Sequence, residues 1–148
     1  MIERVQIRDA LLSDATDISD IDRRVNPSPW TTAGVAQAIT DWHGLAMLEG
    51  SCCIGFSLYQ CVLDEAELLN IAIAPDRQGM GLGAAMLNET LARVRSHDVA
   101  RLHLEVRASN SQAIGLYRRF GFVQSGERKN YYTGTNGRED ALLFELTL

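Results

Sequence analysis

A glycine-rich turn between an apolar run and a helix-forming stretch is the clearest place in this chain for binding an anion. The apolar run ends with Ile71, Ala72 and Ile73, and the helix formers begin at Ala84. Between them lie the residues of the turn: Gln78, Gly79, Met80, Gly81, Leu82 and Gly83. Glycines let the backbone come close to a ligand, and the unpaired N–H groups at a helix N-terminus attract negative charge. This order of strand, glycine turn and helix predicts a phosphate-binding loop.

Two well-known phosphate loops do not fit this turn. The nucleoside-triphosphate loop needs Gly-x-x-x-x-Gly-Lys-Ser/Thr, but the only lysine in the chain is Lys129, far from the glycines. The dinucleotide fingerprint Gly-x-Gly-x-x-Gly, started at Gly79 or Gly81, lacks its third glycine. The pattern that remains, Gln78-x-x-Gly81-x-Gly83, resembles the coenzyme A pyrophosphate loop of the GCN5-related N-acetyltransferases (GNAT).

The spacing of apolar residues predicts the elements that position this loop, because repeats of three and four indicate helices and alternation indicates strands. The predicted order is a strand at 5–7, helices at 15–25 and 32–42, strands at 45–48, 52–62 and 66–73, a helix from 84 that ends near 96–98, a strand at 101–107, a helix ending at 120, and strands at 122–127 and 141–148. This is an α/β (α+β) fold, a mixed and mostly antiparallel sheet of about seven strands flanked by about four helices. It resembles the GNAT fold from end to end, and we expect one domain over residues 1–148.

Some local features are also predicted from residue type. Ser13 or Asp14 is expected to cap the first helix, Thr31 or Thr32 the second, and Ser109 or Asn110 the last. The aspartates of the first helix are expected mainly off its apolar stripe: Asp14, Asp17, Asp20 and Asp22. Residues 130–140 are expected to form a polar, aromatic loop with a tight turn at Asn136-Gly137.

A second group of residues narrows the resemblance. It consists of residues 104–110, Ala113-Ile114, Leu116-Tyr117, 120–122, 130–132 and 137–141. These motifs resemble the RimI subfamily, whose members acetylate the N-terminal alanine of a small-subunit ribosomal protein. The resemblance implies an acetyl-CoA-dependent peptide-alanine N-α-acetyltransferase whose partner is the N-terminal peptide of a basic ribosomal protein.

Acetyl transfer to an amine needs a base for the nucleophile and an acid for the departing thiolate. A weak base is enough, because an α-amino group has a pKa of about 8. By resemblance the base is Glu105, acting through water, and it lies opposite the leucine face of its alternating strand. By resemblance the acid is Tyr117, whose phenol can donate to the thiolate. A solvent-facing carboxylate and a core tyrosine are the structural alternatives.

The resemblance also implies the binding residues. The coenzyme is expected to contact the main chain of Ile71, Ala72 and Ile73, the loop from Gln78 to Ala84, and Asn110. If the two central strands splay apart, free main-chain groups there can pair with pantetheine, and an N–H near Ile71 can face the oxyanion. The family's loop commonly carries basic residues where this chain has Gly79 and Ala84, so phosphate contact is expected to rest on backbone N–H groups and Arg77.

The expected acceptor side is the segment around 131–140. Its candidate residues are Tyr131, Tyr132, Arg138, Glu139 and Asp140. The acidic pair Glu139-Asp140 could attract a basic peptide, and a well-hydrated hairpin is the alternative.

Composition limits the function classes. The formal net charge of −5 and the pI of about 5.1 argue against direct nucleic-acid binding, which needs clustered Lys and Arg. The first ten residues are charged and show neither a secretory signal nor a membrane span, so a cytoplasmic protein without membrane attachment is expected.

The cysteines and histidines suggest no further chemistry. Cys52, Cys53 and Cys61 are expected to be buried, reduced thiols without a nearby histidine. His43, His97 and His103 lack metal-ligand spacing, so no metal is expected. Direct attack of the amine is therefore favoured over a cysteine-linked intermediate. Acetylation of a small-molecule amine, and acyl-CoA binding without turnover, remain as alternative functions.

Overall fold

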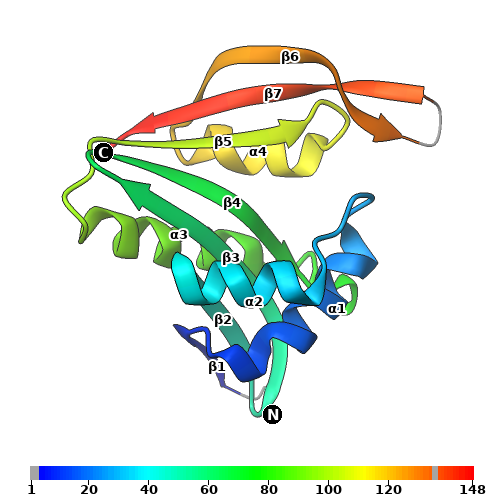
Figure 1. Cartoon of the computed structure of the whole chain (residues 1–148), viewed down its shortest axis with the longest axis vertical. Helices are drawn as coiled ribbons and strands as arrows, with labels where there is room; N and C mark the ends of the chain where they lie inside the picture. Colours follow the sequence, from blue (N-terminus) through cyan, green and yellow to red (C-terminus); the bar gives the residue numbers. More distant parts are fainter. Residues whose placement is uncertain (1–3, 135–136) are drawn as a thin grey trace. The chain divides into compact units, whose positions relative to one another are not determined.

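The computed structural model describes residues 4–134 and 137–148, and its helices and strands follow the predicted order (Figure 1). The elements are β1 (Val5–Asp9), α1 (Ala15–Val25), α2 (Thr32–Asp41), β2 (His43–Glu49), β3 (Cys52–Val62), β4 (Glu65–Ile73), α3 (Leu82–Arg95), β5 (Arg101–Arg107), α4 (Ser111–Arg119), β6 (Val123–Gly134) and β7 (Gly137–Thr147). The strand order in the seven-stranded sheet is β1-β2-β3-β4-β5-β7-β6. Because β4 and β5 are parallel while β5 and β7 are antiparallel, the sheet is mixed, as predicted.

The chain forms two compact units. Unit 1 comprises the chain up to Gln60 together with Leu69–Arg93, and unit 2 comprises Cys61–Leu68 together with Val94–Leu148. Unit 1 therefore contains Ile71–Ile73 of β4 and the glycine loop, and unit 2 contains Glu105 and Tyr117. The expectation of a single domain stays a prediction.

In unit 1 the helices lie on both faces of β3. Phe56 and Leu58 of β3 join a buried cluster with residues of α1 and α2, two helices that lie side by side in Figure 1. Ser57, between them, points to the opposite face of the strand. Its hydroxyl is hydrogen bonded at 2.9 Å to Thr90 of α3, and both side chains are fully buried. Helices α1 and α2 therefore cover one face of β3, and α3 covers the other.

The helix caps are partly as predicted. The Thr31 hydroxyl accepts a hydrogen bond from the Gly34 N–H at 3.0 Å, and the Asn110 side chain accepts one from the Ala113 N–H at 3.2 Å. Asp14 precedes α1 but makes no side-chain cap. Its carboxylate instead pairs with Arg8 at 2.7 Å and accepts a hydrogen bond from the Leu11 N–H at 2.7 Å. The carboxylate therefore stabilises the segment before the helix.

The expectation that the aspartates of α1 lie off its buried stripe is wrong for two of them. Asp14 is 7% exposed and Asp22 is 0% exposed. Asp22 accepts hydrogen bonds from the Trp30 N–H at 2.8 Å and from the Asn70 side chain at 3.0 Å. A carboxylate can be buried when hydrogen-bond donors replace its water, and spacing within the helix does not reveal such distant donors.

In unit 2 the alternation of β5 is confirmed. Leu102, Leu104 and Val106 are buried, and the side chains between them are more exposed. The Arg118 guanidinium of α4 lies 5.7 Å above the ring of Phe144, which pairs with Leu104 across β5 and β7. Helix α4 therefore covers the leucine face of β5, and Glu105 lies on the opposite face.

The predicted polar loop at residues 130–140 is wrong, because β6 and β7 continue through most of it. Tyr132 pairs with Glu139 and Gly134 with Gly137, after an irregularity between Arg128 and Tyr132 at which Asn130 has a φ of 52°. Ladder hydrogen bonds and ion pairs between the strands outweigh the polar composition of this segment. Asn136, predicted in the tight turn, lies outside the described residues.

Within residues 4–134 and 137–148, no helix combines the length and the apolar character that crossing a membrane requires.

Candidate active site

The glycine loop of unit 1 leads directly into the N-terminus of α3. The first backbone hydrogen bond of the helix runs from the Ala85 N–H to the Gly81 carbonyl at 3.1 Å, so the N–H groups of Leu82, Gly83 and Ala84 have no acceptor within the helix. Gly79 and Gly81 have φ values of 81° and 78°, which disfavour any other residue. Around both Cβ positions no described atom lies within 4 Å. N–H groups without an acceptor inside the helix, next to a loop with open space around its glycines, fit a phosphate group.

Two side chains of the loop are already engaged. Gln78 donates from Nε2 to the Ile73 carbonyl at 3.0 Å, which fastens the loop to the end of β4. Arg77 donates from Nε and Nη2 to one carboxylate oxygen of Glu49, at 3.1 Å and 2.8 Å. Since Arg77 already has an anionic partner, the backbone N–H groups are the donors most available to a phosphate.

The end of β4, from Ile71 to Ile73, has a close neighbour that sequence analysis missed. A Cβ on Gly55 of β3 would lie 2.7 Å from Cδ1 of Ile73 and 3.1 Å from the Ala72 carbonyl oxygen. Only glycine lets β3 approach this segment so closely, and a glycine inside the predicted strand at 52–62 was the available signal. Ile71, Ala72 and Ile73 lie beyond the four β4 residues that pair with β5, Glu65–Leu68. Their use by pantetheine stays a prediction.

In unit 2, Glu105 lies half-buried on the polar face of β5, with 24% of its side chain exposed. Its nearest ionic partner is Arg128 of β6, at 3.3 Å. The Arg128 guanidinium also lies 5.1 Å above the ring of Tyr131. Sequence analysis missed Arg128, because its contact with Glu105 depends on strand pairing through β7. The carboxylate keeps access to water and can accept a proton.

Tyr117 is buried in α4, with 6% of its surface exposed and its ring 5.5 Å from that of Phe122. Burial raises the pKa of Tyr117, and the neighbouring Tyr132 raises this pKa further. Proton transfer from a phenol with a pKa of about 10 to the anion of a thiol with a pKa of about 8.5 is already uphill, and burial makes it steeper. At neutral pH Tyr117 therefore keeps its proton and can donate a hydrogen bond.

Tyr132 lies near both candidate catalytic groups. Its pKa is raised by burial first and by the Glu105 carboxylate second. Because Tyr132 also raises the pKa of Tyr117, it lies within electrostatic range of both. Tyr131, next to it, is 47% exposed, and the two rings meet edge to face at 5.0 Å.

The other residues predicted to bind the acceptor form ion pairs and hydrogen bonds within the chain. Glu139 pairs with Arg107 at 2.9 Å, and its second oxygen accepts from the Ser109 N–H at 3.1 Å. Asp140 accepts from the Asn130 N–H at 2.9 Å, and Arg138 donates to the Asn130 carbonyl at 3.2 Å. These contacts stabilise the β6–β7 hairpin, so attraction of a basic peptide by the acidic pair stays a prediction.

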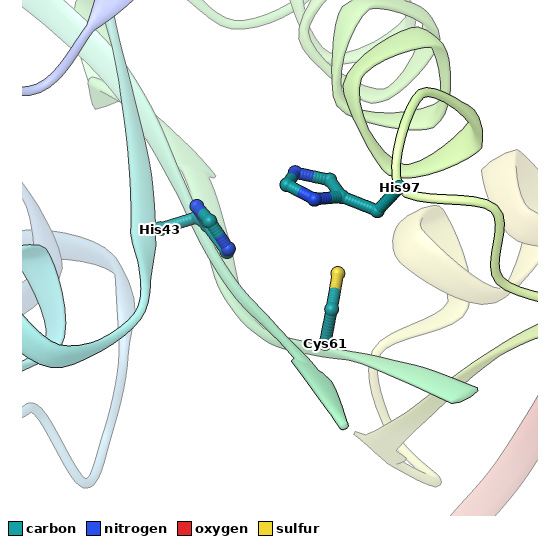
Figure 2. A group of neighbouring side chains, drawn as sticks. All are labelled: His43, Cys61 and His97. Atoms are coloured by element: carbon teal, nitrogen blue, oxygen red, sulfur yellow. The ribbon is translucent and has the colours of Figure 1, made fainter. Parts of the chain in front are cut away.

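The cysteines differ from expectation in two respects. All three are free, but Cys52 is exposed and only Cys53 and Cys61 are partly buried. A nearby histidine is also present, since a ring nitrogen of His97 lies within 4.8 Å of the Cys61 sulfur. Figure 2 shows the Cys61 sulfur pointing towards the His97 ring, both in unit 2, and also draws His43 of unit 1. Burial raises the pKa of Cys53 to about 11 and also raises that of Cys61, which disfavours their thiolate forms. The expectation of no metal stays a prediction.

The sequence matches the family described as the acetyltransferase (GNAT) family over residues 15–122. It is 40% identical over 129 residues to the [ribosomal protein bS18]-alanine N-acetyltransferase of Escherichia coli K12, covering 86% of this chain and 87% of that protein. The enzyme of the same name from Haemophilus influenzae is 36% identical over 132 residues, covering 88% and 90%.

Solved structures are similar over almost the whole chain. The ribosomal-protein-S18-alanine N-acetyltransferase of Escherichia coli superposes with a TM-score of 0.92 at 36% identity, covering 97% of this chain and 94% of that one. Arabidopsis thaliana NAA60, solved with a bisubstrate analogue, gives a TM-score of 0.88 at 19% identity, covering 97% and 98%. The second likeness concerns the fold alone.

Proposed function

Because the chain belongs to the GNAT family of acetyltransferases, we propose that it transfers the acetyl group of acetyl-CoA to the N-terminal alanine of a small-subunit ribosomal protein. The observation that carries this proposal is the 40% identity, over 86% of the chain, to an enzyme named for that reaction. The acceptor is the N-terminal peptide of a basic protein, and the reaction takes place in the cytoplasm without direct contact with nucleic acid or membrane.

Acetyl-CoA supplies the activated acetyl group, and the residues of unit 1 bind it. The N–H groups of Leu82, Gly83 and Ala84 donate to the pyrophosphate, where the positive end of the α3 dipole adds to the attraction. Gly79 and Gly81 give the loop the backbone conformation that this approach requires. The main chain of Ile71, Ala72 and Ile73 holds the pantetheine, and Asn110 of unit 2 contributes a further contact.

Glu105 acts as the general base. An α-ammonium group with a pKa of about 8 has to lose only one proton to become nucleophilic, so a carboxylate acting through water is sufficient. The partly exposed position of Glu105 allows such a water. The ion pair with Arg128 orients the carboxylate.

Tyr117 assists departure of the thiolate by donating a hydrogen bond to the sulfur. Its raised pKa keeps the hydroxyl protonated throughout the neutral range. The N–H of Ile71 donates to the oxyanion that forms on the acetyl carbonyl. The amine attacks directly, without a cysteine-linked intermediate, and burial disfavours the thiolates of Cys53 and Cys61.

Steady-state acetylation of synthetic peptides tests this proposal. A basic peptide beginning Ala-Arg-Tyr should be acetylated at its α-amino group, and the same peptide with a blocked N-terminus should not react. Mass spectrometry of the product locates the acetyl group. Turnover of polyamines or aminoglycosides, with none of the peptide, would contradict the assigned acceptor. Binding of acetyl-CoA without turnover of any amine would contradict an enzymatic function.

A further inference from the structure

We propose that Arg107 and Glu139 are positioning residues, which together hold Tyr132 and the β6–β7 hairpin in place for the acceptor amine. This inference rests on the proposed function and gives Glu139 an internal role. Neither residue would touch the acceptor; both would act through Tyr132.

Arg107 is the centre of the arrangement. Its side chain is only 11% exposed, although it lies at the end of β5. The guanidinium donates from Nη1 to the Glu139 carboxylate at 2.9 Å and to the Thr133 carbonyl at 3.2 Å. The central carbon of the guanidinium, Cζ, lies 4.3 Å from the centre of the Tyr132 ring. One largely buried cation therefore contacts three features of the hairpin, namely the Glu139 side chain, the Thr133 carbonyl group and the face of the Tyr132 ring.

Glu139 links this arrangement to the connection between β5 and α4. One of its oxygens accepts from Arg107, and the other accepts from the Ser109 N–H at 3.1 Å. The Ala108 N–H also donates to the Asp140 carbonyl at 3.1 Å, beside the same contact. Because both carboxylate oxygens have donors within the chain, drawing Glu139 towards a peptide would break one of these bonds.

The consequence for chemistry depends on where Tyr132 lies. It pairs with Glu139 across the hairpin and lies in electrostatic range of both Glu105 and Tyr117. Arg107 is two residues after Glu105 on the same face of β5. Strand β5 therefore positions both Arg107 and the proposed base Glu105. The contact between Arg107 and the Tyr132 ring fixes the distance from β5 to Tyr132.

Substituting an ion pair with a purely structural role would have a different effect from substituting Arg107. An exposed pair contributes little to stability and nothing specific to substrate use. Lys129 offers a matched control on the same hairpin, because it pairs with Glu127 at 3.1 Å and Asp140 at 3.7 Å while its side chain is 72% exposed. If only charge on the hairpin mattered, Lys129→Gln would act like Arg107→Gln.

Amide hydrogen exchange of the free protein tests the positioning without any acceptor. Arg107→Gln and Glu139→Gln should each speed exchange in residues 128–133 and 108–111 by about tenfold. The first removes the bond to the Thr133 carbonyl, the second weakens the bond from the Ser109 N–H, and both remove the Arg107–Glu139 ion pair that links the two segments. Lys129→Gln should leave both segments unchanged. Unchanged exchange in the first two variants, while they remain folded, would overturn the proposal.

Peptide kinetics test the consequence for the reaction. Arg107→Gln should lower kcat/KM for the alanine peptide about tenfold and leave KM for acetyl-CoA within about twofold. In a Tyr132→Ala background, Arg107→Gln should have no further effect, because its partner is already gone. Additive losses in the double variant would overturn the role through Tyr132. Absence of peptide turnover in the wild type would contradict the proposed function instead, and the exchange result would still decide the positioning.

Discussion

Glu105 and Tyr117 illustrate how the surroundings of a side chain decide what it can do. Glu105 keeps 24% of its side chain exposed and is paired with Arg128, so it stays an accessible carboxylate. Tyr117 is buried, and the resulting rise in its pKa makes complete proton transfer to a thiolate steeper than residue type suggests. Residue identity and motif were enough to nominate both groups, whereas Arg128, Tyr132 and Arg107 gain their importance from contacts across strands.

Replacing the two candidate catalytic groups should slow turnover without weakening coenzyme binding. Glu105→Gln and Tyr117→Phe are each expected to lower kcat by about tenfold to a thousandfold, because base assistance or leaving-group stabilisation is lost. Stopped-flow or steady-state kinetics measure kcat, and calorimetry measures the Kd of acetyl-CoA. Unchanged turnover in either variant would remove that residue from the mechanism.

Restoring a cation beside the glycine loop should tighten coenzyme binding. Arg77 is occupied by Glu49, and the half-buried Ala84 lies in the first turn of α3. Ala84→Arg is expected to lower the Kd of acetyl-CoA about fivefold through a charge-assisted hydrogen bond to phosphate. The exposed neighbour Ala85 provides the control variant Ala85→Arg, which should have little effect. Equal effects of the two variants would mean that the gain is only long-range attraction.

The elements themselves were largely predictable, because their apolar periodicity is strong. The alternation of β5 and the cap at Thr31 both appear as expected. The extension of β6 and β7 through residues 130–140 was not predictable, since this part of the hairpin is stabilised by cross-strand pairs such as Tyr132 with Glu139 rather than by an apolar pattern. The same is true of Gly55, whose importance comes from the closeness of β4.

Filling the space beside the coenzyme strand should weaken coenzyme binding. Gly55→Ala places a methyl group 3.1 Å from the Ala72 carbonyl oxygen and closer still to Ile73, so β4 must shift. We expect the Kd of acetyl-CoA to rise and unfolding to become easier by about 1–3 kcal/mol. Gly115→Ala on α4 is the control, because no described atom lies within 4 Å of its Cβ position and alanine favours helix. A Gly55→Ala protein with unchanged coenzyme affinity would contradict this account of β4.

For the molecule as a whole, the sequence pointed to the family and fold, but not to the division into two units or to the buried carboxylates of unit 1. Asp14 and Asp22 each lie four residues from the buried Ile18, on the same side of the helix, and their hydrogen-bond donors include groups outside the helix. Contacts between distant parts of a sequence are what a single sequence leaves undetermined.

The Asp14 ion pair should make stability depend on pH in the acid range. The Arg8 hydrogen bond holds the pKa of Asp14 below its usual value despite burial. Such a carboxylate contributes its stabilisation above its unfolded pKa of about 3.9 and loses it as the pH falls through the lower folded value. Asp14→Asn should therefore cost about 1–3 kcal/mol at pH 7 and progressively less below about pH 4. Urea unfolding at pH 7 and below about pH 4 measures this cost in unfolding free energy. Asp17→Asn, at an exposed position, is the control. A cost that does not change with pH would contradict the ion-pair explanation.

The central proposal concerns which amine receives the acetyl group, and mass spectrometry of protein N-termini in cells with and without this protein tests it most directly. The proposal predicts that the N-terminal alanine of one small-subunit ribosomal protein is acetylated only when the protein is present. A copy carrying Glu105→Gln should not restore the modification. Unchanged acetylation of that alanine in cells lacking the protein would contradict the proposal.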